Sequence, residues 1–214
     1  MAFLTSWVKF NFWKEGNYTF ISSRGKSEEV QVQLNAPLEL TGLWNIKFEP
    51  ATGVDNMELN LDKLILWNEH PDNEIKYFAG TAIYTKSFEL TAEQATHPSR
   101  LDLGDIHDIA HIWINGEDLG IIWTKPWTVN LSGFLKEGMN ELKIEVTNCW
   151  ANRLIGDAAL PEDKRSVKTN VRLVPDRSEY KRGHQATSAD DPLLPSGLSG
   201  PVFIEFGQNQ TITF

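Results

Sequence analysis

Alternation of apolar and polar residues with a period of two is the dominant pattern of this chain of 214 residues. In residues 140–148, Leu142, Ile144 and Val146 alternate with charged neighbours. Side chains on a β-strand point alternately to opposite faces, so the segment predicts a strand with one face in the core. Similar segments are residues 80–90, 107–114, 119–123, 127–131 and 200–206. Short strands joined by Gly, Pro and Asn turns predict an all-β fold, an antiparallel β-sandwich of the jelly-roll type.

One turn is marked by its own residues. Asn115–Gly116 lies between two alternating segments, and both residues tolerate a positive φ, so the pair predicts a tight hairpin. No long amphipathic helix is visible. We expect short helical pieces only near residues 61–66 and 92–94.

One domain boundary is visible near the N-terminus. Residues 17–34 read as a hairpin, and residues 35–37 follow as a linker. Two strands alone are marginal in water. We therefore expect residues 1–36 to be an appendage or the remnant of a preceding domain, and residues 37–214 to form the sandwich. An irregular stretch rich in charge, Pro and Ser runs from 160 to 199, and long loops of this kind are often functional.

The charge balance and the single cysteine exclude several classes of function. The net charge is −9 and no stretch is strongly basic, which disfavours nucleic acid and acidic membrane surfaces as partners. Cys149 alone excludes an internal disulfide and a thiolate zinc cage. No run approaches the ~18 apolar residues of a membrane span. The first residues do not resemble a secretory signal, so the protein is intracellular or its signal lies outside this sequence.

Several motifs between residues 38 and 206 occur in an order that chance rarely gives. They are Gly80-Thr81-Ala82-x-Tyr84-x-Lys86-x-Phe88, Asn115-Gly116-x-x-x-Gly120-x-x-Trp123-x-x-Pro126, Trp150-Ala151-Asn152-Arg153-Leu154-Ile155-Gly156-Asp157 and Pro195-Ser196-Gly197-Leu198-Ser199-Gly200-Pro201. Together they resemble the jelly-roll, galactose-binding-like domain of large glycoside hydrolases. The resemblance is closest to the C-terminal region of the family 106 α-L-rhamnosidase-like proteins, and the sugar-binding domain of family 2 is a more distant relative.

The resemblance implies a role outside the chemical step. Eight βα units of a catalytic barrel take ~200 residues or more and do not fit here beside the sandwich. It therefore implies a non-catalytic carbohydrate-binding or accessory domain, with a polysaccharide and the catalytic domain of a larger enzyme as partners. The parent enzyme is then expected to be periplasmic or secreted. A structural module that braces a barrel and a small stand-alone hydrolase remain as alternatives, because a fold does not carry its activity with it.

The first candidate carbohydrate site is the segment of Trp123, Lys125 and Trp127. Pyranose rings have apolar C–H faces that stack on indole, and a charged neighbour can bond their hydroxyls. The alternative is that one or both indoles fill the sandwich core or cover its end.

The second candidate group is Trp150, Asn152, Arg153 and Asp157, which follow directly on a core strand. The three polar side chains offer directional donors and acceptors for sugar hydroxyls. Alternatively, Arg153 and Asp157 pair with each other and fix the loop in which they lie.

Neither a metal site nor a catalytic pair can be assigned from the sequence. His107 and His111 have the spacing of the zincin helix motif, but on a strand they stand ~13 Å apart, too far to share one metal. No compact Asp-rich loop supports a structural Ca²⁺, so we expect no cofactor. Glycoside hydrolysis needs two carboxylates across a cleft, which a sequence cannot show. The acids available for such a pair are Asp102, Asp105, Asp108, Asp157, Glu162 and Asp163.

Overall fold

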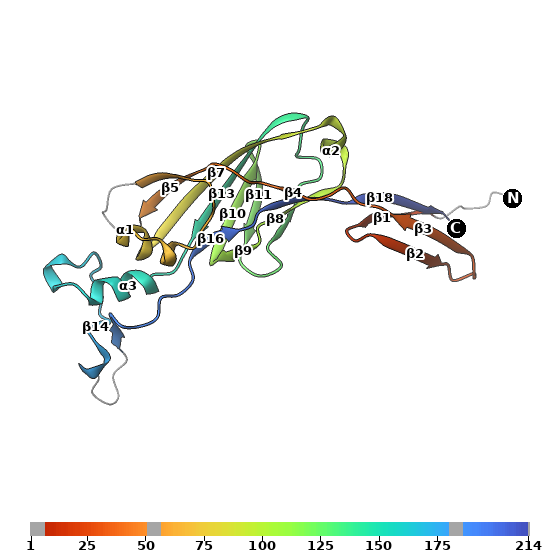
Figure 1. The fold of residues 1–214 in the computed structure, drawn as a ribbon. Helices are drawn as coiled ribbons and strands as arrows, with labels where there is room; N and C mark the ends of the chain where they lie inside the picture. The colour runs from red at the N-terminus through yellow and green to blue at the C-terminus, as the bar shows by residue number, and fades with distance from the viewer. Residues whose placement is uncertain (1–6, 51–56, 180–185, 214) are drawn as a thin grey trace.

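Two antiparallel sheets form the body of the computed structural model, which describes residues 7–50, 57–179 and 186–213 (Figure 1). The larger sheet has the strand order β11 (Glu117–Ile122), β10 (Ile109–Ile114), β13 (Gly138–Thr147), β7 (Gly80–Leu90), β5 (Trp44–Pro50) and β6 (Met57–Leu61). The smaller sheet has the order β12 (Thr128–Asn130), β8 (Ser99–Asp102), β17 (Phe203–Phe206) and β4 (Leu38–Glu39). The predicted antiparallel β-sandwich is therefore confirmed.

Strands form in the predicted segments, but segments 107–114 and 200–206 are each divided. In the second, residues 201 and 202 lie outside any strand and β17 starts at Phe203. β7 has the predicted bounds, and Leu142, Ile144 and Val146 of β13 are fully buried as expected. Residues 107–114 do not form one strand, because the chain changes partners at Asp108. β9 (Asp105–His107) pairs with β16 (Gly197–Gly200), whereas β10 pairs with β11 and β13. The Asp108 carboxylate accepts a hydrogen bond from the Cys149 backbone N–H at 2.9 Å, so the residue between β9 and β10 has a side-chain partner of its own.

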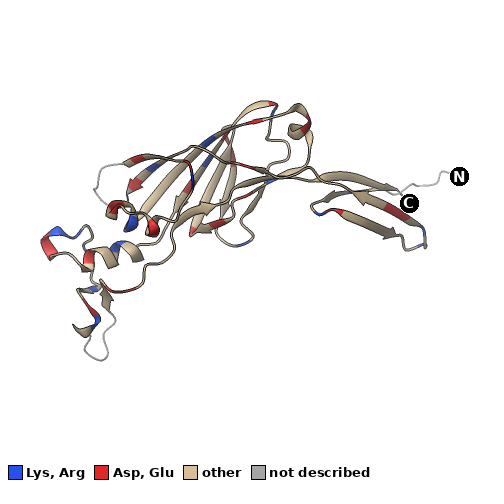
Figure 2. Ribbon diagram, in the orientation of Figure 1, with Lys and Arg blue, Asp and Glu red and all other residues tan. Residues whose placement is uncertain are grey.

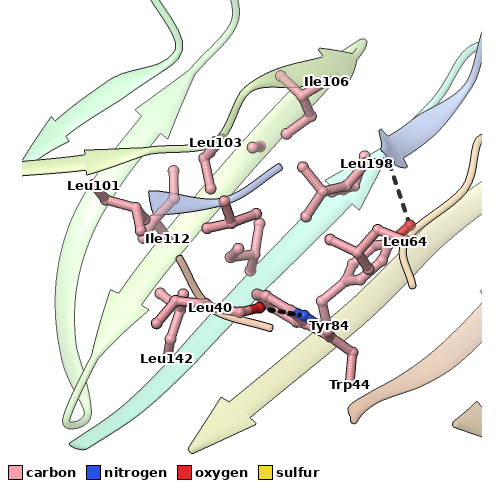
Figure 3. Close-up of a cluster of buried hydrophobic side chains, with 14 of the residues drawn as sticks. Leu40, Trp44, Leu64, Tyr84, Leu101, Leu103, Ile106, Ile112, Leu142 and Leu198 are labelled. Carbon is pink, nitrogen blue, oxygen red and sulfur yellow. Dashed lines mark hydrogen bonds between the residues drawn. The ribbon is translucent and has the colours of Figure 1, made fainter. Parts of the chain in front are cut away.

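The core lies between the two sheets and contains a buried phenol (Figure 3). The Tyr84 hydroxyl accepts a hydrogen bond from Trp67 Nε1 at 2.6 Å and another from the Leu198 backbone N–H at 3.3 Å. Trp44 Nε1 donates to the Leu40 carbonyl at 3.1 Å. Three distant segments, at residues 67, 84 and 198, are thus joined inside the core by polar contacts as well as by apolar packing.

The helical expectations are confirmed at one place and wrong at another. α2 (Ala92–Thr96) forms where the 92–94 piece was expected, with Thr91 and Gln94 as a capping box. Residues 61–66 do not form a helix. Helical turns come later, at η1 (Trp67–Glu69) and α1 (Asn73–Lys76). No helix among the described residues has the length and apolar character needed to cross a membrane.

One further helix, α3 (Ala151–Ala158), forms where the sequence indicated a loop. Trp150 stands at its N-cap position without a capping side-chain bond, so the usual signal for a helix start is missing. Around α3 lie η2 (Glu162–Lys164), η3 (Arg177–Glu179) and the parallel pair of β14 (Arg172–Val174) and β15 (Ala186–Ser188). Figure 1 shows α3 and β14 together at one end of the molecule. The predicted irregular stretch of 160–199 is thus broken by short elements, and its residues 180–185 lie outside the described ones.

An arm extends from the opposite end of the sandwich (Figure 1). The predicted hairpin is present as β2 (Gly16–Ile21) and β3 (Ser27–Val32). It packs against a ribbon of β1 (Trp7–Phe12) and β18 (Gln208–Thr213), and Phe12, Val30, Val32 and Ile212 form a small second core. The arm therefore combines strands from both predicted units, 1–36 and 37–214.

A contact between a cation and an aromatic ring lies where the arm meets the sandwich. The Arg100 guanidinium of β8 lies 4.5 Å from the centre of the Trp13 ring and also pairs with Glu205 of β17. A cation over an indole is attracted by the ring, so this contact favours one position of the arm. Elsewhere, Lys and Arg are interspersed with Asp and Glu along the described strands (Figure 2).

Candidate functional site

Trp123 is the most exposed aromatic side chain of the sandwich body among the described residues, with 72% of its surface accessible. It follows the last residue of β11, where the chain leaves the larger sheet and crosses to β12 in the smaller one. An indole held in solvent at such a crossing offers an apolar plane on which a sugar ring can stack.

Charged groups lie beside this loop. Lys125 Nζ is 3.5 Å from Asp105 Oδ1, and the other oxygen of Asp105 is 3.1 Å from His107 Nε2. Asp105 therefore links the loop after β11 to β9. The Lys125 side chain remains 74% exposed, so its ammonium stays available as a hydrogen-bond donor.

Trp127 has a different position from Trp123. It is half-buried and packs against the main core, as the alternative interpretation had it. Its backbone carbonyl accepts a hydrogen bond from the Leu103 N–H at 3.0 Å, while its buried Nε1 has no partner among the described residues. Trp127 anchors the loop, and the plane open to solvent is that of Trp123.

The residues of the second candidate group also differ in their exposure to solvent. Trp150 is 39% exposed at the start of α3, whereas Asn152 is 2% exposed. The Asn152 amide donates to the Leu194 carbonyl and accepts from the Leu194 N–H, both at 2.8 Å. Asn152 therefore holds the chain before β16 in place, and these bonds satisfy much of its side chain.

Arg153 and Asp157 do not pair with each other, so the alternative of a mutual clamp is wrong. Arg153 reaches Glu74 of α1 at 3.9 Å and Ser166 at 3.3 Å. Asp157 is fully buried, and its Oδ2 accepts from the Val167 N–H at 2.8 Å. Both side chains thus hold residues 166–167 against α3, and Arg153 also reaches α1. The second oxygen of Asp157 has no partner among the described residues.

A cluster on the outer face of the larger sheet was not singled out by the sequence. The Trp113 ring lies 3.7 Å from the His111 ring, and Lys143 Nζ is 3.9 Å from the Trp113 centre. His111 Nε2 is 2.7 Å from Asp118 Oδ1. Two hydrogen bonds lower the pKa of Asp118. The larger effect comes from the backbone N–H of Gly120 and the smaller one from His111. The only signal for this cluster was the alternation of β10, which puts His111 and Trp113 on one face.

The two candidate metal-binding histidines and several of the candidate carboxylates contact other groups of the chain. His107 and His111 contact different aspartates, and the described part of the chain holds no group of three His, Cys, Asp or Glu suited to a metal ion. Asp102 accepts from the Gly104 N–H at 2.9 Å, a bond typical of a side chain that stabilises a turn.

The two antiparallel sheets are those of the galactose-binding-like β-sandwich class. A family model described as "Glycosyl hydrolase 2 galactose-binding domain-like" matches residues 62–189. The chain therefore belongs to this family of glycoside hydrolase domains, and the predicted resemblance is confirmed.

Three comparisons extend the match. A Formosa agariphila protein named "Putative beta-glucuronidase" is 36% identical over 202 residues, which are 88% of this chain and 17% of that protein. A rhamnosidase from Novosphingobium sp. PP1Y has a TM-score of 0.65 at 30% identity, covering 85% of this chain and 15% of the other. The Ruminococcus gnavus β-glucuronidase has a TM-score of 0.55 at 16% identity over 86% and 34%, and shares the fold. This chain thus spans about a sixth of the first two proteins.

Proposed function

We propose that this chain is a non-catalytic carbohydrate-recognition module that works with the catalytic domain of a larger glycoside hydrolase. Membership of the glycoside hydrolase family supports the enzyme context. The names of its relatives, a rhamnosidase and a β-glucuronidase, indicate glycosides that carry L-rhamnose or D-glucuronic acid as the ligands to test.

The observation that carries the proposal is the exposed plane of Trp123 beside Lys125 and Asp105. Stacking on an indole supplies affinity but does not distinguish one sugar ring from another. The ammonium and carboxylate can bond hydroxyls at the edge of the ring. One shallow plane buries little area, so a single sugar binds weakly. Its Kd lies in the millimolar to high micromolar range, which is a binding free energy of about −4 to −6 kcal/mol.

Binding to a glycan microarray of plant, algal and bacterial polysaccharides tests the proposal. Gum arabic, which contains both rhamnose and glucuronic acid, serves as the soluble probe in affinity electrophoresis. We expect retardation of the wild type and its loss in Trp123→Ala. Trp7→Ala is the matched control, because it removes an indole that is 68% exposed but lies in the arm. Equal retardation of Trp123→Ala and the wild type would contradict the role of this plane.

A second candidate function is the bracing of a catalytic barrel. Asn152, Arg153 and Asp157 are buried and hold the chain around α3, so they contribute to a rigid fold and not to a solvent-exposed ligand site. If no glycan binds, the bracing role is favoured. The stand-alone hydrolase is tested by turnover of aryl glycosides, and a loss of that turnover on a single Asp→Asn change would support it.

A further inference from the structure

Trp150 follows the larger sheet at the same end as Trp123. In β10, Ile109 pairs with Thr147, the last residue of β13. The next residue of β10 pairs with Ile122, the last residue of β11. Trp123 directly follows the end of β11, and Trp150 comes three residues after the end of β13, so the two lie beyond strand ends that flank the start of β10 on either side.

The spacing of these strand ends exceeds the size of one sugar ring. β11 and β13 are separated by two inter-strand distances, about 10 Å. A single pyranose on Trp123 cannot also cover Trp150, whereas a chain of several units can. The exposed residue between them is Ile109, which is 44% accessible and offers a second apolar contact.

Both indoles stand on backbone that is held in place. The Asp108 carboxylate accepts from the Cys149 N–H at 2.9 Å and so ties the exit of β13 to the start of β10. The Trp150 carbonyl accepts from the Leu154 N–H at 3.0 Å as the first bond of α3. On the other side, the loop after Trp123 is anchored at Trp127, whose backbone carbonyl accepts from the Leu103 N–H at 3.0 Å. A fixed pair of platforms loses little conformational entropy on binding.

From this placement we propose that the ligand is an oligosaccharide laid across the ends of β11, β10 and β13, with Trp123 and Trp150 as two separate stacking platforms. The inference rests on the proposed function and adds the ligand's minimum size. It requires affinity to rise with chain length until both indoles are covered and to stay constant beyond that length.

The test uses a microarray of size-graded oligosaccharides, from one to eight units, released from gum arabic and from plant and algal polysaccharides. For the oligosaccharides that bind, calorimetry then measures the affinity for the wild type, Trp123→Ala, Trp150→Ala and Trp150→Tyr. Trp150→Tyr keeps an aromatic ring at the start of α3, so it separates loss of stacking from a disturbed helix. Thermal unfolding of each variant checks the fold.

The expected result is at least tenfold tighter binding of chains of four or more units than of the monosaccharide. Trp150→Ala should reduce long-chain affinity about tenfold to the short-chain value, and Trp150→Tyr should restore most of it. Trp123→Ala should weaken chains of every length. Binding that is independent of length and unchanged in Trp150→Ala overturns the two-platform inference and leaves the proposed function standing. Absence of binding to every oligosaccharide overturns both.

Discussion

Asn115 Nδ2 donates a hydrogen bond to Asn140 Oδ1 at 2.8 Å, which joins the β10–β11 turn to the start of β13. Asn115 has the positive φ of 52° that the turn requires. Asn140 is 1% exposed and also bonds both backbone groups of Lys136, at 3.0 Å and 2.7 Å. The buried amide thus organises two turns at the same end of the sheet.

Asn140→Ala should lower the free energy of unfolding by about 3 kcal/mol, because several buried backbone and amide groups lose their partner together. Urea denaturation measures the change. Asn130→Ala is the control, since its exposed side chain accepts one bond, from the Ser132 N–H at 3.2 Å, and its loss should cost about 1 kcal/mol or less. Equal effects of the two substitutions would contradict the role given to Asn140.

Gly197→Ala should be far more harmful than Gly133→Ala. Both glycines have a positive φ, +91° and +90°, so both substitutions bear the strain of a left-handed backbone. A Cβ at residue 197 would lie 2.6 Å from Trp67 Cδ1, whereas a Cβ at residue 133 meets nothing within 4 Å. We expect a loss of about 1–2 kcal/mol at 133 and more than that at 197. Thermal unfolding of the two variants should show the difference, and equal melting temperatures would refute it.

Tyr84 should remain a neutral phenol in the folded protein at alkaline pH. Burial raises the pKa of Tyr84 well above its ordinary value, because the phenolate would lose its hydration. A raised folded pKa means that the associated stability is fully present below the unfolded pKa of about 10 and declines as the pH rises beyond it. Stability measured from pH 9 to 12 should therefore fall more steeply in the wild type than in Tyr84→Phe. Parallel curves would contradict this expectation.

Asp118 should contribute to stability only while it is ionised. The Gly120 N–H donates to its carboxylate at 2.7 Å, which with His111 lowers the pKa of Asp118. The contribution is present above the unfolded pKa of about 3.9 and is lost as the pH falls through the lower folded value. The melting temperature of Asp118→Asn should thus lie below that of the wild type at pH 6 and approach it near pH 2. Glu117→Gln controls for the loss of an exposed negative charge, and a gap that persists at pH 2 would contradict the assignment.

The strands were predictable because their signal is local. Alternation in residues 140–148 fixes which side chains of β13 face the core, and Asn115–Gly116 carries its own conformational preference. The division at Asp108 was not predictable, because it depends on β16, which joins β9 from a distant part of the chain. The same holds for β18, whose pairing with β1 joins opposite ends of the sequence.

The candidate sites were predictable by residue type but not by exposure. Two tryptophans four residues apart look alike in sequence, yet Trp123 is open to solvent and Trp127 is packed against the core. Asn152 looked available for a hydroxyl, but its amide is bonded to the backbone of Leu194, 42 residues away. Such long-range bonds decide which polar side chains are free, and a local pattern does not contain them.

The β1–β18 ribbon also has a mechanical consequence. Trp7 pairs with Thr213 at the outer end of the ribbon. A force that pulls these two residues apart would therefore break the paired residues of the ribbon one pair at a time, starting from that end. Antiparallel strands pulled in this peeling geometry part at low force, because each backbone pair bears the load alone. Under tension the arm should therefore open first, as an extensible tether, while the sandwich behind it stays intact.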